Sequence, residues 1–179
     1  GTGREGEYIQ AEGAPPEVQE GEVLVANQWL SVDHYMRGRM TEAKSYVPPF
    51  ALHSALDGGA IGTVQDSRHP DFAVGDRVSS MLGWRDSLVA KADQLTRLPD
   101  TTLPAQLFLG ALGMPGMTAW VGLNRIAKLQ AGETVLVSAA SGAVGSMVVQ
   151  LAKRAGARVI GSTGSADKVA YLKTLGADE

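Results

Sequence analysis

Short apolar runs separated by a small-residue turn organise the second half of the chain. Residues 135–137 (Val-Leu-Val) have the length and composition of a buried strand. After a turn over 139–145, apolar residues recur at helical spacing through 147–152. Residues 158–161 predict a second strand, and 165–168 predict the start of another helix. The order strand, glycine turn, helix, strand is typical of a βαβ unit.

The first half, residues 1–97, has a different pattern. Strand-like apolar segments lie at 22–30, 58–64 and 87–90, and residues 73–78 form a turn that enters a further strand. The glycines of 58–64 predict a strand that bends or lies close to another backbone. Short strands separated by Gly and Asp turns at this spacing predict a small β-barrel.

The composition changes near Leu98, where the strand-like segments stop. Prolines then introduce a short helix over 104–109 and a second helix over 117–126. The pattern therefore predicts two domains, 1–97 and 98–179. Two parallel strands do not make a stable doubly wound sheet, so we expect the natural protein to continue beyond the end of this sequence.

Composition narrows the class of protein further. The 179 residues are 44% hydrophobic and 20% charged, which is typical of a globular chain. A net charge of −3 gives no electrostatic case for binding nucleic acid or an anionic membrane. No apolar run approaches the roughly 18 residues of a membrane helix, and no signal peptide is visible. The absence of cysteine excludes disulfides in these residues and fits a cytoplasmic location.

The small-residue turn has the spacing of a dinucleotide-binding motif. In the G-x-G-x-x-G frame, Ala140 takes the first position and Gly142 and Gly145 take the others. Alanine is tolerated there if the first residue needs no positive φ. Gly142 would let the backbone approach a pyrophosphate and Gly145 would let helix and strand pack closely, while the amides of Ala143 and Val144 would face the anion. A turn that serves packing alone, without a ligand, remains an alternative.

The end of the second strand favours NADP over NAD. NAD sites carry an acid roughly 20 residues after the first glycine, where it binds the ribose hydroxyls. Residues 159–164 contain no acid, and Lys168 follows them with a charge that could neutralise a 2′-phosphate. The missing acid also argues against a methyltransferase. A solvated Lys168 on a helix surface is the alternative interpretation.

Four motifs in this order resemble the medium-chain dehydrogenase/reductase superfamily across almost the whole chain. They are LSVDHYMRGRM (30–40), GMPGMTAW (113–120), SAASGAVGS (138–146) and GSTGSADK (161–168). The likeness is strongest to the zinc-independent branch of prostaglandin, alkenal and curcumin reductases. It implies an α/β chain: a GroES-like β-barrel domain that lacks its C-terminal return segment, followed by the first part of a Rossmann doubly wound domain. It also implies NADP(H) as cofactor, and a homodimer in the full-length protein.

Zinc-dependent members of the superfamily bind the metal through Cys and His. These residues contain no Cys, and their histidines are His34, His53 and His69. His53 lies near the place where zinc-dependent relatives have a ligand, but a hydrogen-bonded or solvent-facing histidine is the favoured interpretation. No metal site is expected.

Without a metal, reduction of a polarised C=C bond is the most feasible reaction. Hydride from NADPH would reach the β-carbon of an enone or enal, and a donor must stabilise the resulting oxyanion. Tyr35 is the first candidate, because a neutral phenol can donate a hydrogen bond and the resemblance places it near nicotinamide and substrate. A packed aromatic ring is the alternative for Tyr35.

Other candidate residues follow from the resemblance and the loops. Tyr46, in a polar loop, is a candidate for substrate binding, although a plain surface loop is equally compatible. The resemblance implies that Met117 and Thr118 touch the nicotinamide, whereas the pattern alone makes them core and cap residues. Asp33 and Arg37 are expected to form a structural ion pair. His34 replaces the usual proline and is an alternative proton donor.

Two other functions remain open on the sequence. One is a quinone reductase of the same superfamily, and the other is a non-catalytic protein that binds NADPH.

Overall fold

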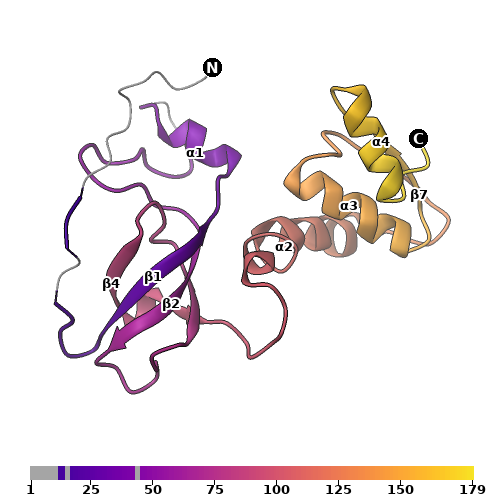
Figure 1. Ribbon diagram of the computed structural model, residues 1–179. Coiled ribbons are helices and arrows are strands. Elements are labelled where there is room, and N and C mark those ends of the chain that lie inside the picture. The colour runs from indigo at the N-terminus through magenta and orange to yellow at the C-terminus, as the bar shows by residue number, and fades with distance from the viewer. Residues whose placement is uncertain (1–11, 15–16, 43–44) are drawn as a thin grey trace. The chain divides into compact units, whose positions relative to one another are not determined.

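The computed structural model describes residues 12–14, 17–42 and 45–179. Two compact units make up the chain, Gly1–Pro99 and Asp100–Glu179. Figure 1 shows both units and labels several of their elements. Among the helices of the described residues, none combines the length and hydropathy needed to cross a membrane.

The first unit is built on an antiparallel sheet of five strands in the order β4-β1-β2-β3-β5. The strands are β1 Glu22–Leu30, β2 Ala60–Ser67, β3 Arg77–Ser80, β4 Ser87–Lys91 and β5 Thr96–Arg97. The edge strands β4 and β5 are consecutive in the chain and are joined by the short 3₁₀ turn η1, Ala92–Gln94. The sheet must therefore curl to bring its two edges together. Among the described residues these edges are not paired, so the predicted barrel is an open one.

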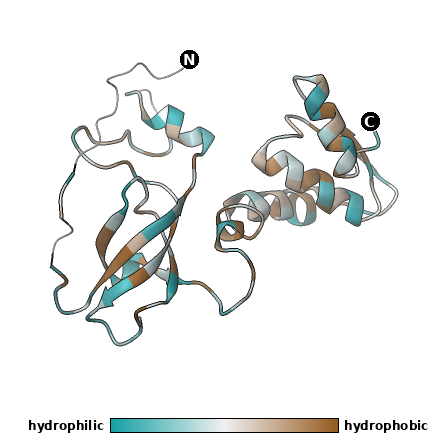
Figure 2. Cartoon of the chain, in the orientation of Figure 1, coloured by the Kyte–Doolittle hydropathy of each residue, from teal (hydrophilic) through white to brown (hydrophobic). Residues whose placement is uncertain are grey.

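The core of the first unit follows from alternation along the strands. Val25 of β1 is 1% exposed. It is paired with Val64 of β2 on one side and with Leu88 of β4 on the other. Buried and partly exposed residues therefore alternate from Glu22 to Ala26, and the strands of this sheet carry both apolar and polar residues (Figure 2). Gly62 lies where a Cβ would be 2.4 Å from the Ala26 carbonyl oxygen, which confirms the predicted close approach of two backbones.

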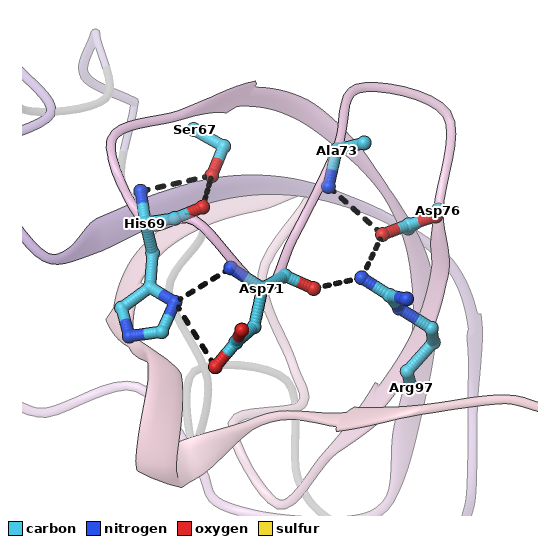
Figure 3. A network of polar contacts seen from close by, with 6 residues as sticks. All are labelled: Ser67, His69, Asp71, Ala73, Asp76 and Arg97. Carbon is cyan, nitrogen blue, oxygen red and sulfur yellow. Dashed lines mark hydrogen bonds and ion pairs between the residues drawn. The ribbon is translucent and has the colours of Figure 1, made fainter.

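A polar network fixes the connection between β2 and β3 (Figure 3). His69 Nδ1 accepts a hydrogen bond from the Asp71 backbone N–H at 3.2 Å. Arg97 forms an ion pair of 2.8 Å with Asp76 and also donates to the Asp71 carbonyl. Asp76 accepts from the backbone N–H of Ala73 at 2.8 Å. His69 is therefore hydrogen bonded within a structural turn.

The second unit contains the predicted βαβ unit. Its elements are η2 Ala105–Leu109, α2 Met114–Val121, the π-helical turn η3 Gly122–Ala127, β6 Thr134–Val137, α3 Ala143–Arg154, β7 Arg158–Gly161 and α4 Ala166–Thr174. Strands β6 and β7 are parallel and pair from Thr134 with Arg158 to Val137 with Gly161. The helix predicted over 117–126 begins earlier, at Met114, and its last turn is π-helical.

The sheet of the second unit is covered on one face. Val137 is 6% exposed and Val159 is fully buried, and both belong to a core that includes Val149 and Ala152 of α3. Leu136, by contrast, is 74% exposed. The prediction that 135–137 form a fully buried strand is therefore wrong for Leu136, because neighbouring strand residues face opposite sides of a sheet and the described residues cover only one.

Candidate functional site

The turn between β6 and α3 has one left-handed residue, Ala139, with a φ of 46°. Ala140, the first position of the motif, is buried and donates its N–H to the Ser162 carbonyl at 2.9 Å. The residue with positive φ is therefore Ala139, which precedes the motif, and Ala140 does not have a positive φ. This explains why alanine can occupy the first position.

Gly145 is required by close packing. A Cβ there would lie 2.5 Å from the Ala139 carbonyl oxygen and 2.8 Å from the Ala140 Cα. The helix can approach the turn so closely only with glycine at this position, as the sequence predicts. Gly142 is different, because its Cβ would meet only the Ala139 oxygen, at 3.1 Å, with open space elsewhere. Its outer side is free for a ligand.

Helix α3 begins at this turn without a side-chain cap. Gly142 is its N-cap residue, and no side chain there makes a capping hydrogen bond. The N–H groups of Ala143, Val144 and Gly145 lie in the first turn, where an α-helix offers them no intrahelical acceptor. Three converging N–H donors and the positive end of the helix dipole fit the pyrophosphate of a dinucleotide.

The ends of β6 and β7 are joined by polar contacts at the same edge of the sheet. Ser141 Oγ and Thr163 Oγ1 lie 2.8 Å apart, so one hydroxyl donates to the other. Ser162 donates its N–H to the Val137 carbonyl at 2.9 Å. The turn that would bind pyrophosphate is thus held to the segment that, in this type of fold, lies beside the adenosine ribose.

Lys168 lies in the first turn of α4, shortly after this segment. Its side chain is exposed. Among the described residues no carboxylate forms a recorded ion pair with it. Its charge is therefore available for an anion.

Met117 and Thr118 lie in α2 and are both exposed. Met117 is 62% exposed, and the N-cap residue of the helix is Gly113. The pattern-based interpretation of the two residues as core and cap is therefore wrong. Their side chains are open to a ligand, and the buried positions of this helix are Pro115, Gly116 and Ala119.

In the first unit, Tyr35 lies in the short helix α1, His34–Arg39, directly after β1. The next residue, Met36, is 3% exposed, and a Cβ on Gly58 would lie 2.5 Å from its Cε. The Tyr35 hydroxyl is also buried, and no partner for it exists among the described residues. A buried donor without a partner is uncommon in a folded protein.

The surroundings of Tyr35 keep its phenol neutral. Burial raises the pKa of Tyr35 above its ordinary value, and the Asp33 carboxylate raises that pKa further. The Arg39 charge opposes this shift, and Asp57 and Tyr46 add to it. At neutral pH the hydroxyl is therefore a hydrogen-bond donor.

The predicted ion pair between Asp33 and Arg37 does not form among the described residues. Asp33 is the N-cap residue of α1, and its carboxylate accepts a hydrogen bond from Ser31 Oγ at 2.6 Å. Arg37 is exposed, and its Nη1 lies 4.0 Å from the Met40 sulfur. Asp33 is thus bonded to Ser31 at the start of the helix, and Arg37 lies beside Met40 instead.

Sequence reasoning missed Arg39, which is 12% exposed and forms an ion pair with Asp57. Its position four residues after Tyr35, on the same face of α1, was the available signal. Tyr46 is 87% exposed, whereas residues 43–44 of its loop lie outside the described residues. His34 and His53 are exposed. No group of three potential metal ligands is found in the described parts of the chain.

Comparison with known proteins gives two family matches. A family described as the N-terminal domain of oxidoreductase matches residues 2–98. A second, described as zinc-binding dehydrogenase, matches residues 143–179.

Individual relatives agree with these matches. An NADPH-dependent curcumin reductase of Escherichia coli is 42% identical over 160 residues, 89% of this chain and 46% of that protein. A 2-alkenal reductase (NADP⁺-dependent) of Nicotiana tabacum is 45% identical over 161 residues, 88% of this chain and 47% of that protein. The crystal structure of CurA in complex with NADPH from Vibrio vulnificus superimposes with a TM-score of 0.87 at 40% identity, covering 96% of this chain and 50% of that one.

The chain thus spans about half the length of the curated relatives it matches. The first family match alone covers more than half of this chain. The glycine turn at the start of α3 and the acid-free end of β7 agree with these matches. The chain therefore belongs to the medium-chain dehydrogenase/reductase superfamily, in the branch that includes curcumin and 2-alkenal reductases.

Proposed function

We propose that the protein containing this chain is an NADPH-dependent reductase of the C=C bond in α,β-unsaturated ketones and aldehydes. The observation that carries this proposal is the buried Tyr35 hydroxyl, which has no partner among the described residues and stays protonated at neutral pH. The names of the relatives, a curcumin reductase and a 2-alkenal reductase, support the same reaction.

The second unit offers the groups that would bind the cofactor. The N–H groups at 143–145 would hold the pyrophosphate, and the open side of Gly142 would admit it. Lys168 would pair with the 2′-phosphate. The exposed Met117 and Thr118 would contact the nicotinamide. Bound NADPH supplies the hydride that is added to the β-carbon.

Tyr35 would act on the substrate carbonyl. As the β-carbon accepts hydride, negative charge builds on the carbonyl oxygen of the enone, and the resulting enolate then takes up a proton from water at its α-carbon to give the saturated product. A neutral phenol that donates to this oxygen stabilises the growing charge most in the transition state, where the charge is largest. Because the Tyr35 hydroxyl has no competing acceptor among the described residues, substrate would complete its hydrogen bonding. Tyr46, exposed nearby in the chain, would contact the substrate.

The proposed reaction needs no zinc. These 179 residues contain no cysteine, so the thiolate ligands typical of zinc sites in the superfamily are missing here. The proposal also takes the whole protein to be a homodimer, which light scattering of the whole protein would test, and to be cytoplasmic, which cell fractionation would test.

The test follows NADPH absorbance in the whole protein with an enone, a quinone or no acceptor, each with and without a metal chelator. We expect turnover with the enone that the chelator does not change. Turnover with quinones alone would establish the quinone reductase instead. NADPH binding without turnover of any acceptor would support the non-catalytic alternative.

A further inference from the structure

Arg39 contacts the segment 48–57 through both its side chain and its backbone. Its Nε donates to the Pro48 carbonyl at 2.9 Å, and its Nη2 lies 3.5 Å from Asp57 Oδ2. The guanidinium lies over the ring of Phe50, 4.0 Å from the ring centroid. The Arg39 carbonyl accepts the N–H of Phe50 at 2.9 Å. Four contacts of different kinds thus join one residue of α1 to this segment.

The Arg39 side chain is largely buried, so its charge is stabilised mainly by these contacts with protein groups. With 12% of the Arg39 side chain exposed, much of the guanidinium has lost its water and depends on protein groups for compensation. A guanidinium donates from a planar fork and stacks on an aromatic face at the same time. A lysine ammonium keeps the charge but cannot make both contacts in that geometry.

Helix α1 depends on such contacts for its position. It has six residues, too few for a helix to be stable by itself in water. Met36 anchors it on Gly58, and Arg39 anchors it on the segment just before that glycine. Tyr35 belongs to the same short helix, so its position depends on both anchors.

We propose that Arg39 is a positioning residue that clamps the segment 48–57 onto α1 and thereby holds the Tyr35 hydroxyl in its working place. This inference rests on the proposed function, because the position of Tyr35 affects the rate only if its hydroxyl acts on the substrate. Arg39 itself touches neither substrate nor cofactor in this proposal.

A double-mutant cycle in the whole protein tests the inference. The variants are Arg39→Lys, Tyr35→Phe and the two combined, and Arg37→Lys is the matched control on the same helix. We expect Arg39→Lys to lower kcat for the enone by about tenfold when Tyr35 is present, and by less than about twofold in the Tyr35→Phe background. Arg37→Lys should change neither value.

Affinity for NADPH, measured by calorimetry, should be unchanged in Arg39→Lys, because the glycine turn belongs to the other unit. An equal loss of kcat in both backgrounds, no loss in either, or weakened NADPH binding would each overturn the inference. If Tyr35→Phe alone leaves kcat unchanged, the proposed role of Tyr35 is wrong and this inference falls with it. A loss confined to the Tyr35 background is the supporting result.

Should Arg39→Lys fail to fold, Phe50→Leu provides the second test. It removes the aromatic face and leaves the ion pair with Asp57 in place. We expect a smaller loss of kcat that again disappears in the Tyr35→Phe background. A loss that persists there would contradict the role of Arg39.

Discussion

At the scale of single residues, the proposed chemistry depends on two side chains, one for which the described residues show no hydrogen-bond partner and one for which they show no ion pair. The Tyr35 hydroxyl is buried without an acceptor among the described residues, and Lys168 is exposed without a recorded carboxylate partner. An unsatisfied buried hydroxyl costs about 1–3 kcal/mol of folding free energy. The proposed substrate oxygen would supply the acceptor that the described residues lack.

Lys168 gives the prediction at this scale. Lys168→Ala should raise the Kd for NADPH by about tenfold, because one charge-assisted contact to the 2′-phosphate is lost. The Kd for NADH should stay nearly the same, since NADH has no such phosphate. Calorimetric titration of the whole protein with both cofactors measures this. Lys91→Ala, the same charge change in the first unit, is the control, and equal weakening of NADH binding would show that Lys168 does not recognise the 2′-phosphate.

At the scale of elements, the turn between β6 and α3 combines two demands. Gly145 allows α3 to lie against the backbone of Ala139 and Ala140, whereas Gly142 leaves its outer side open. Gly145 therefore serves packing, and Gly142 would admit the proposed cofactor. The same turn is joined to the end of β7 through Ser141 and Thr163.

Gly145→Ala should destabilise the second unit by about 1–3 kcal/mol, because the added methyl group meets backbone atoms that cannot rotate away. Urea unfolding of the whole protein measures this loss. Gly164→Ala is the matched control, since a Cβ at Gly164 would have no neighbour within 4 Å. An equal effect of both substitutions would mean that the close approach at Gly145 is not the cause.

At the scale of the whole molecule, the chain divides into two units, each with its own hydrophobic core. Charged contacts join the last residues of the chain to the rest of the second unit. Asp178 accepts hydrogen bonds from Lys153 Nζ at 2.6 Å and from the Val159 N–H at 2.8 Å. The bond from Lys153 is the main reason that the pKa of Asp178 is lowered, and the Val159 N–H adds to the effect.

This shift predicts how the stability of the second unit depends on pH. Because the pKa of Asp178 is lowered in the folded state, its contribution is present above the ordinary pKa of an aspartate and is lost as the pH falls through the lowered value. Asp178→Asn should therefore reduce the free energy of unfolding at neutral pH and have little effect in strong acid. Urea unfolding across this pH range checks the prediction, and a difference that does not depend on pH would contradict it.

Local spacing was enough to predict the βαβ elements and much of the glycine turn, whereas helix α1 was not predicted. The βαβ order, the close packing at Gly145 and the missing acid after β7 all depend on residues near one another in the sequence. Hydrophobic periodicity and glycine spacing act over a few residues, so they can be read without a structure. The resemblance added Tyr35, Met117 and Thr118 as candidates.

Only the tertiary structure decided which of these side chains are buried and what they touch. The burial of the Tyr35 hydroxyl, the exposure of Leu136 and the contact of Arg39 with Asp57 depend on segments far apart in the chain. A spacing of four residues suggested Arg37 as the partner of Asp33, whereas the Asp33 carboxylate is bonded to Ser31. The sequence by itself thus determined the βαβ elements and most of the strands, since their causes are local, whereas burial and long-range partners are set only when distant segments pack together.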